Sequence, residues 1–283
     1  MPKIPSPPAE SLRRDVLPLR GRTALVTGAS RTGGIGYALG RRLAAYGASV
    51  YLHHHVPHDA AQPWGAGRGG AGAVAAGVRE ALGDPEAVVC HGPADLSGAD
   101  APAELLATAA DALGGRVDIL VANHALSGSD GPLGAIDAAM LDAHWAVDAR
   151  SVILLVQAYA RLRATLPVRT PGGRVLMMTS GQDIAGGMPD EMAYALAKGA
   201  LASATRSLAT SLADLAVTVN CVNPGPVDTG YLDGEPYAEI AAMFPAGRWG
   251  MPDDPARLIA WLATDEAEWV TGQVIDSEGG FRR

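Results

Sequence analysis

Residues 23–36 read TALVTGASRTGGIG, and this stretch decides the fold. It begins with a short apolar run, which is typical of a strand buried on both faces. A glycine-rich turn follows, and then Leu39, Leu43 and Ala44 recur at helical spacing until Gly47. Glycines let a pyrophosphate approach the backbone, and the start of the helix offers it unpaired N–H groups. Strand, glycine turn and helix in this order therefore predict a dinucleotide-binding unit, whereas without such flanks a flexible loop would be favoured.

Strand-like and helix-like segments alternate along the rest of the chain. Further strands are expected at 48–52, 87–90, 117–121, 173–178, 217–222 and 273–275, and helices at 71–82, 102–113, 136–162, 188–215 and 255–263. Residues 56–70 are expected to form a long irregular loop. The alternation, without an internal repeat, predicts an α/β fold with one doubly wound parallel sheet, the Rossmann arrangement, in a single domain. We expect this domain at 21–283, after a loosely ordered, proline-rich leader at 1–20.

Composition excludes several classes of function. The chain of 283 residues carries a net charge of −8 and no basic run, which disfavours nucleic acids and anionic membrane surfaces as partners. No apolar run reaches the ~18 residues of a membrane span, and the leader lacks the apolar core of a signal peptide, so we expect a cytoplasmic protein. Cys90 and Cys221 lie in apolar runs and are expected to be buried small hydrophobes, not a disulfide or a metal site.

Three consecutive histidines, His53, His54 and His55, end the second predicted strand. In dinucleotide-binding folds this strand end meets the adenosine ribose, where an acidic residue binds the 2′-hydroxyl. No acidic residue stands there, and Arg31 together with the histidines would favour a 2′-phosphate, so NADP(H) is predicted and NAD(H) stays open. Alternate strand residues face opposite ways and no further His/Cys cluster completes a ligand set, so we predict no metal site.

Tyr194 and Lys198 are four residues apart on a predicted helix, so their side chains leave the same face. An ammonium favours a nearby phenolate, although a Tyr-x-x-x-Lys pair on its own is most often a solvated helix face. The carboxyl ends of parallel strands meet at one edge of a sheet, where ligands bind. Four further residues follow predicted strand ends and are therefore expected in the same cleft, namely Gly28, Asn123, Ser180 and Pro224.

These motifs occur in a fixed order between about residue 20 and residue 281. They are Thr27-Gly28 with Gly34 and Gly36, Asp95, Asn123, Ser180, Tyr194 with Lys198, Pro224-Gly225, and Thr271-Gly272-Gln273 before Gly279-Gly280. In this combination the chain resembles the short-chain dehydrogenase/reductase family. The resemblance implies interconversion of a carbonyl and an alcohol by hydride transfer to or from a nicotinamide. It also implies cofactor contacts from Gly28, Ser30, Arg31, Gly34, Ile35, Gly36, His54, Asp95, Leu96, Asn123, Tyr194, Lys198, Pro224, Gly225, Val227 and Thr229.

The resemblance assigns a role to each residue of the catalytic set. Tyr194 would be the general acid in reduction and the base in oxidation. Lys198 would lower the pKa of Tyr194 and bind the nicotinamide ribose, and Ser180 would polarise the substrate oxygen. Thr179 is an alternative to Ser180, because Ser180 precedes Tyr194 by one residue more than the family pattern.

Two further positions differ from the family pattern. Asp148 stands where an Asn usually holds a proton-relay water. It either holds the same water, or its carboxylate offsets the charge of Lys198 and raises the pKa of Tyr194. His124 stands at a usually small position, and a packing or hydrogen-bonding role is favoured there over a catalytic one.

The glycine turn is longer than the family pattern between Gly28 and Gly34. Enoyl reductases of the same superfamily share such a turn but space their Tyr and Lys further apart, so the sequence favours carbonyl chemistry over enoyl reduction. A non-catalytic nucleotide sensor that kept the fold is another alternative. A methyltransferase is disfavoured because it gives the Tyr–Lys pair no role.

The substrate is expected to be a small carbonyl or alcohol compound. Residues 231–244 resemble a mobile lid over it, and Gln182, Met188 and Trp64 are candidates for the wall of its pocket. Small residues follow Lys198 at one-face spacing and would let a second helix approach closely, so a homotetramer or homodimer is expected. These small residues are Gly199, Ala202 and Ser203.

Overall fold

The computed structural model describes residues 13–167, 171–184, 186–231 and 234–282. In these residues seven parallel strands form one sheet in the order β3-β2-β1-β4-β5-β6-β7. They are β1 (Thr23–Val26), β2 (Ser49–His54), β3 (Val89–Pro93), β4 (Ile119–Ala122), β5 (Gly173–Met178), β6 (Val217–Asn223) and β7 (Val274–Asp276). The strand order reverses between β1 and β4, so the sheet is doubly wound. The predicted α/β Rossmann fold is confirmed.

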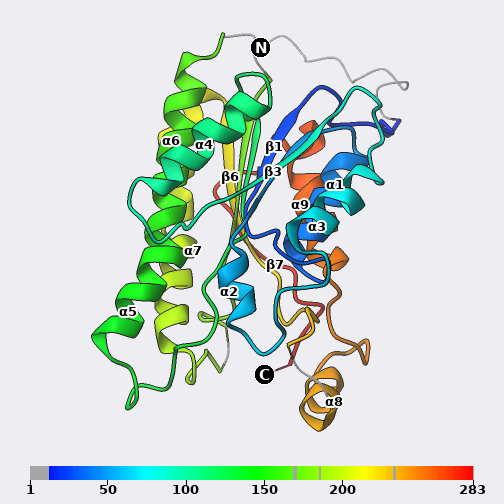
Figure 1. Ribbon diagram of the computed structural model, residues 1–283. Coiled ribbons are helices and arrows are strands. Elements are labelled where there is room, and N and C mark those ends of the chain that lie inside the picture. The colour runs from blue at the N-terminus through cyan, green and yellow to red at the C-terminus, as the bar shows by residue number, and fades with distance from the viewer. Residues whose placement is uncertain (1–12, 168–170, 185, 232–233, 283) are drawn as a thin grey trace, which may run out of the picture.

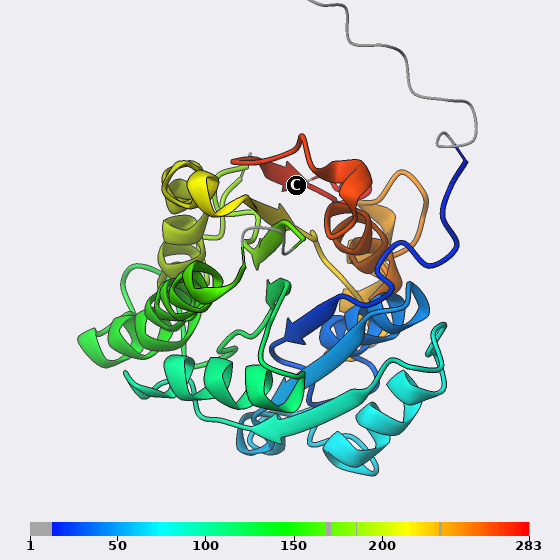
Figure 2. The same cartoon turned by 90° about the horizontal axis from the view of Figure 1, so that it is seen from above.

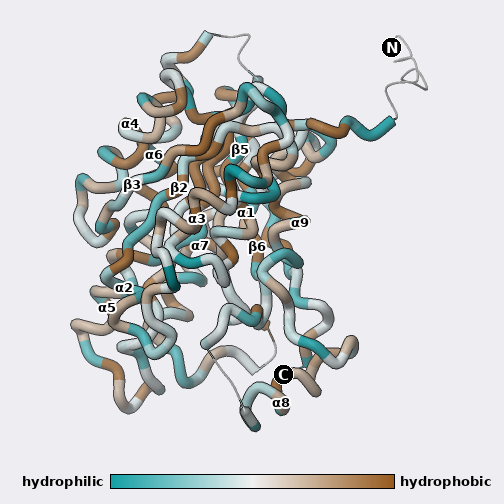
Figure 3. Tube along the Cα trace, turned by 45° about the vertical axis from the view of Figure 1, so that its right-hand side comes forward, coloured by the Kyte–Doolittle hydropathy of each residue, from teal (hydrophilic) through white to brown (hydrophobic). Residues whose placement is uncertain are grey.

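Helices cover both faces of the sheet (Figures 1 and 2). One layer holds α1 (Ile35–Ala45), α3 (Gly70–Arg79) and α9 (Asp253–Leu262), and the other holds α4 (Ala101–Ala112), α6 (Ser151–Thr165) and α7 (Met192–Leu212). Each layer packs a buried apolar cluster against the sheet, with Leu39 and Ile259 in one and Leu155 and Leu201 in the other. Figure 3 shows the most hydrophobic segments running through the central strands, between the two helical layers.

Three segments differ from their predicted structure. The expected loop at 56–70 contains a short helix, α2 (Val56–Ala60). The helix expected at 136–162 is divided into α5 (Ala138–His144), a π-helical turn (Trp145–Arg150) and α6. The helix expected from residue 188 begins at Met192, and a 3₁₀ turn (Ala213–Leu215) follows its end. A π-turn hardly changes the apolar spacing, so hydrophobic periodicity cannot reveal it.

The packing of the domain begins before the expected boundary at residue 21. Residues 1–12 of the expected leader lie outside the described part of the chain. Leu19 is fully buried, and its N–H donates to the carbonyl oxygen of Tyr46 at 2.9 Å. Leu19 therefore belongs to the core and not to a loose leader.

The two cysteines are free. Cys221 is buried as expected, whereas Cys90 is only half-buried. Within the described residues, no group of three or more His, Cys, Asp or Glu side chains is arranged to hold a metal ion. No helix in that part of the chain is long and apolar enough to cross a membrane.

Candidate active site

A cavity of about 1230 Å³ opens at the carboxyl ends of the strands, around the point where the strand order reverses. Residues from many segments that are distant in sequence line it, as expected where the strands of a doubly wound sheet end. The sequence-predicted residues on its wall are Gly28, Ser30, Arg31, Gly34, Ile35, Asp95, Leu96, Asn123, Ser180, Tyr194, Lys198, Pro224, Gly225, Val227 and Thr229. The strand-end residues thus meet the Tyr–Lys pair in one cavity.

Gly36 contributes to this cavity indirectly, from behind the glycine turn. A Cβ atom on Gly36 would lie 2.4 Å from the carbonyl oxygen of Gly28. Gly28 itself has a φ of +73°, and a Cβ there would lie 2.7 Å from the Cα of His124. Both positions therefore need glycine, which brings α1 against the turn and keeps the turn open for a ligand.

The structure does not bring His54, a predicted cofactor contact, to the cavity. The His54 side chain faces the neighbouring strand, where its Nε2 lies 3.2 Å from Nδ1 of His91. His53 and His55 line the cavity instead. Successive residues of a strand point to opposite faces of the sheet. His53 and His55 therefore reach the cavity, whereas His54 points to the other face, where it meets His91 of β3.

Asn123 ties the end of β4 to the glycine turn. Its side-chain amide donates to the carbonyl oxygens of Thr27 at 2.9 Å and Gly28 at 3.2 Å. His124, the next residue, is buried, with Nδ1 2.7 Å from Thr27 Oγ1 and Nε2 2.7 Å from Ser151 Oγ. Burial lowers the pKa of His124 well below its usual value, so the ring is neutral and holds β4 to its neighbours.

Arg31 crosses the mouth of the cavity. Its Nε lies 3.0 Å from Oδ1 of Asp59, and its guanidinium also donates to the carbonyl oxygen of Thr229 at 2.9 Å. The guanidinium carbon lies 5.2 Å from the centroid of the Trp64 ring, whose indole N–H donates to Asp59 at 3.3 Å. Burial lowers the pKa of Arg31, while Asp59 raises it. Asp59 was not predicted from the sequence, since the expected loop gave it no defined position.

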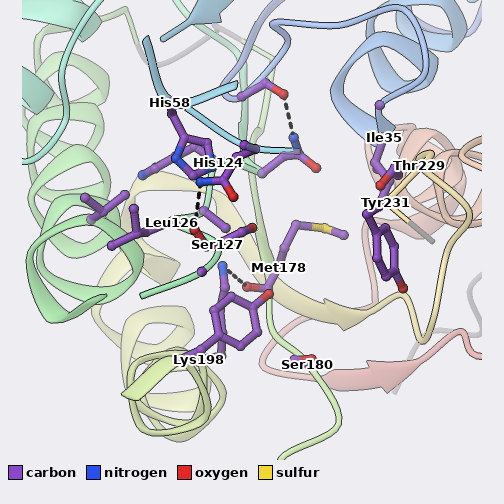
Figure 4. A pocket seen from close by; sticks show the side chains of 18 of the residues that line it. Ile35, His58, His124, Leu126, Ser127, Met178, Ser180, Lys198, Thr229 and Tyr231 are labelled. Carbon is purple, nitrogen blue, oxygen red and sulfur yellow. Dashed lines mark hydrogen bonds between the residues drawn. The ribbon is translucent and has the colours of Figure 1, made fainter. Parts of the chain in front are cut away.

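Ser180, Tyr194 and Lys198 form the chemical centre of the cavity. Figure 4 shows Lys198 and Ser180 on its wall. The Lys198 ammonium donates to the carbonyl oxygen of Met178 at 3.3 Å and lies 5.6 Å from the centroid of the Tyr194 ring. The Ser180 side chain is hydrogen-bonded to Tyr194. Thr179 is buried and donates its hydroxyl to the carbonyl oxygen of Lys198 at 3.0 Å. Both residues line the cavity, but the Thr179 hydroxyl is bonded to the backbone of α7, whereas the Ser180 side chain acts on Tyr194.

The electrostatics of this centre differ from the simple expectation that Lys198 makes Tyr194 acidic. Burial raises the pKa of Tyr194, the charges of Asp148 and Glu191 raise it further, and the hydrogen bond with Ser180 lowers it. Burial also lowers the pKa of Lys198, which Asp148 partly opposes. Tyr194 therefore keeps its phenolic proton at neutral pH.

Asp148 lies behind the cavity wall and not on it, and its charge raises the pKa of Tyr194, as one of the two predicted roles requires. The side chain is fully buried in the π-helical turn. Its Oδ1 accepts the N–H of Leu126 at 2.6 Å, and its Oδ2 accepts Nδ1–H of His144 at 2.9 Å. Asp148 thus acts on the cavity through its charge and through His144, which does line the cavity.

Besides Asp59, two wall residues close to Tyr194 were missed by the sequence analysis. His144 precedes Asp148 by one helical turn, and this i, i+4 spacing was the signal available for it. Asp130 accepts the backbone N–H groups of Ala193 at 2.9 Å and Tyr194 at 2.8 Å. No sequence pattern connects Asp130 to a helix that begins some sixty residues later.

The expected substrate side of the cavity is partly as predicted. Trp64, Met188 and Tyr231 line the cavity, whereas Gln182 bonds to Thr179 outside it. The expected lid at 231–244 contains α8 (Gly234–Ala242), while residues 232–233 lie outside the described part of the chain. Burial raises the pKa of Tyr231 to about 12. The Tyr231 hydroxyl is therefore a neutral hydrogen-bonding group at the cavity.

Comparison with known proteins agrees with this geometry. A family model described as enoyl-(acyl carrier protein) reductase matches residues 28–282. The uncharacterized oxidoreductase YjdA of Bacillus subtilis is 43% identical over 263 residues, which cover 93% of this chain and 97% of that protein.

Three solved structures are similar to this chain in both sequence and fold. A short-chain dehydrogenase/reductase from Serratia marcescens is 31% identical, with a TM-score of 0.77 over 93% of this chain and 99% of its own. The promiscuous reductase LugOII, which catalyses keto-reduction at C1 during lugdunomycin biosynthesis, is 32% identical, with a TM-score of 0.76 over 93% and 98%. A blue fluorescent protein from a metagenomic library, in complex with NADPH, is 30% identical, with a TM-score of 0.78 over 94% and 99%.

Proposed function

The chain belongs to the short-chain dehydrogenase/reductase family, and from this premise we propose that it reduces the carbonyl group of a small organic molecule to an alcohol, with a nicotinamide dinucleotide as hydride donor. The observation that carries the proposal is the convergence of Ser180, Tyr194 and Lys198 in one cavity with the glycine turn. An acid, a hydrogen-bond donor and a nucleotide cradle in one place are the parts that such a reaction needs.

The residues present fit a dinucleotide. Gly28 and Gly36 let the glycine turn pack tightly against His124 and α1, because a Cβ atom at either position would meet backbone atoms, and the N-terminus of α1 follows this turn. When bound, the cofactor supplies a hydride to the carbonyl carbon of the substrate. Asn123, by bonding the Thr27 and Gly28 carbonyls, holds the turn in its open form.

The proton for the reduction comes from the protein side of the cavity. Tyr194 donates its phenolic proton to the carbonyl oxygen as that oxygen gains negative charge. The Ser180 hydroxyl, at the same face of the cavity, donates a hydrogen bond to the oxygen and stabilises the charge. Lys198 compensates the phenolate that remains, because its ammonium lies 5.6 Å from the ring. Burial keeps Tyr194 protonated at neutral pH, so the proton is present for transfer.

We propose NADP(H) as the cofactor, with NAD(H) as the alternative. Arg31 places a cation at the cavity, and His53 and His55 line it where an acidic residue would favour a free ribose hydroxyl. The related blue fluorescent protein was solved with NADPH. Asp59 opposes this choice in part, because it already pairs with Arg31 at 3.0 Å.

The test is to mix the purified protein with NADPH or NADH and a panel of ketones, aldehydes and an enoyl thioester, and to follow the absorbance of the reduced nicotinamide. We expect oxidation of NADPH with at least one ketone or aldehyde, and an alcohol as the product. Cofactor binding without turnover of any carbonyl, and without oxidation of any alcohol, would instead favour a nucleotide sensor.

Enoyl reduction is a second candidate, because the long glycine turn and the description of the matching family model favour it. The four-residue spacing of Tyr194 and Lys198 favours carbonyl reduction. The product decides between them, since an enoyl reductase yields a saturated thioester and no new hydroxyl group.

We further propose that the enzyme works in the cytoplasm as a homodimer or homotetramer. The small residues after Lys198 would admit a second helix against α7, next to the half-exposed Leu196. Light scattering of the purified protein gives the number of subunits, and a monomeric mass at micromolar concentration would refute the assembly.

A further inference from the structure

His144 lies on the wall of the same cavity, and the proposed function gives it no role. The residue ends α5 and is fully buried. Its ring packs edge-on against Tyr194, with centroids 6.0 Å apart and planes at 85°. A buried, titratable ring in contact with the proposed acid requires an explanation.

Both ring nitrogens of His144 face hydrogen-bond acceptors. Nδ1 lies 2.9 Å from Oδ2 of Asp148, and Nε2 lies 3.1 Å from the carbonyl oxygen of Gly128. Neither acceptor can donate, and a neutral imidazole carries only one N–H. A neutral ring can donate to only one of these two acceptors, whereas an imidazolium donates to both, including the fully buried Asp148 carboxylate. The geometry therefore favours the charged form.

The charges around the ring also favour a cation. Asp148 stands on the following turn, Asp130 approaches Nε2 to 4.0 Å from the loop after β4, and Glu191 acts from the start of α7. Lys198 on α7 and His58 on α2 are the other titratable groups that interact with Asp148. Burial lowers the pKa of His144, but the bond to Asp148 and the nearby carboxylates outweigh it and raise the pKa overall.

The state of His144 decides how strongly Asp148 acts on Tyr194. With an imidazolium beside it, the carboxylate belongs to a nearly neutral pair and has a weak field at the phenol. With a neutral ring, the carboxylate is unbalanced, and a negative charge near a phenol makes the phenol a weaker acid. Asp148 is one of the groups that raise the pKa of Tyr194.

We infer that His144 is a positioning residue for the proposed reduction: as an imidazolium bonded to Asp148, it balances that carboxylate and so keeps Tyr194 able to give up its proton. The inference rests on the proposed function for its catalytic part. The direction of the expected pH dependence follows from the positive charge of the protonated His144 ring. His144 holds its proton up to a pH above the usual ~6.5 of a histidine, and reduction slows as the pH rises through the point where that proton is lost.

The first experiment needs no turnover. Imidazole ¹⁵N and ¹³C resonances of His144 are followed through a pH titration of the wild type and of Asp148→Asn, with His144→Gln to assign the signal. We expect both ring nitrogens to be protonated at neutral pH, and Asp148→Asn to lower the midpoint by at least one pH unit. A neutral ring below pH 6, or a midpoint that Asp148→Asn leaves unchanged, would overturn the inference.

The second experiment measures kcat against pH for reduction of an accepted ketone. We expect the wild type to lose activity on the alkaline side at the midpoint found by NMR. His144→Gln should lack this alkaline decrease in its pH profile. Its kcat near neutral pH should be at least tenfold lower, with little change in the KM for NADPH. The double variant His144→Gln/Asp148→Asn should recover part of the kcat, because the unbalanced charge is gone.

His91→Gln is the matched control, since His91 is exposed and pairs with His54 outside the cavity. It should keep the wild-type profile. An unchanged alkaline limb in His144→Gln, or no recovery in the double variant while thermal unfolding shows it folded, would contradict the role. If the wild type reduces no carbonyl, the proposed function fails, and the NMR titration still decides whether the charged pair exists.

Discussion

The carboxylate of Asp130 accepts the backbone N–H of Tyr194 at 2.8 Å. The same carboxylate accepts the N–H of Ala193 at 2.9 Å, so a residue of the loop after β4 caps the N-terminus of α7. Glu191, which directly precedes the helix, makes no side-chain cap of its own. The position of the proposed acid therefore depends on a contact between two distant segments.

Replacing Asp130 with Ala should lower both stability and activity. Loss of a helix cap costs about 0.5–2 kcal/mol, and the freed first turn of α7 would move Tyr194 relative to Ser180. Urea unfolding and kcat measure the two effects. Asp137→Ala is the control, because Asp137 caps α5 through the N–H of Met140 at 2.9 Å, on an exposed surface. Equal loss of kcat in both variants would contradict the positioning role of Asp130.

Replacing Gly36 with Ala should weaken cofactor binding. The new Cβ would lie 2.4 Å from the Gly28 carbonyl oxygen, so the turn must shift. We expect NADPH affinity, measured by fluorescence titration, to fall at least about tenfold, which corresponds to roughly 1.4 kcal/mol. Gly33→Ala in the same turn should bind normally, because its Cβ meets nothing closer than 3.9 Å. Normal binding by Gly36→Ala would refute the close-approach account.

Replacing Asp59 with Asn should strengthen NADPH binding more than NADH binding. The change removes the carboxylate that pairs with Arg31 at 3.0 Å and leaves the guanidinium free for the additional phosphate of NADPH. Dissociation constants for both cofactors measure the effect. Trp64→Phe, which loses the indole bond to Asp59 but keeps an aromatic ring near Arg31, is the comparison. A parallel change for both cofactors in Asp59→Asn would show that Arg31 does not discriminate between them.

The two neighbouring hydroxyls at the end of β5 should differ in their effects. Ser180→Ala should lower kcat by about 10²–10³-fold, as loss of a donor to a developing oxyanion does. Thr179→Val should mainly lower stability, by about 1–2 kcal/mol, because its hydroxyl bonds the Lys198 carbonyl in the interior. The reverse pattern would reassign the donor to Thr179.

Much of this fold could be predicted because strand ends and glycines carry local signals. Gly28, Asn123, Ser180 and Pro224 were expected in one cleft from the topology of a parallel sheet, and all four line the cavity. The doubly wound parallel sheet follows from rules that apply to alternating strands and helices, whereas the order of its strands was not predicted.

The remaining features depend on register and on contacts between distant segments. The opposite orientations of His53 and His54 are set by where β2 begins, at Ser49, and one residue of register would exchange them. The π-helical turn places His144 and Asp148, and it leaves almost no trace in the apolar spacing. Asp130 caps its helix through a contact that no local pattern encodes.

The most direct test of the account is Tyr194→Phe, which removes one hydroxyl group and keeps the ring that packs against His144. The variant should bind NADPH as tightly as the wild type and unfold at the same temperature. Its kcat for reduction of the same ketone should fall by about 10²–10⁴-fold, since the general acid is lost. Reduction at the wild-type rate by a variant that is folded and binds NADPH would contradict the account.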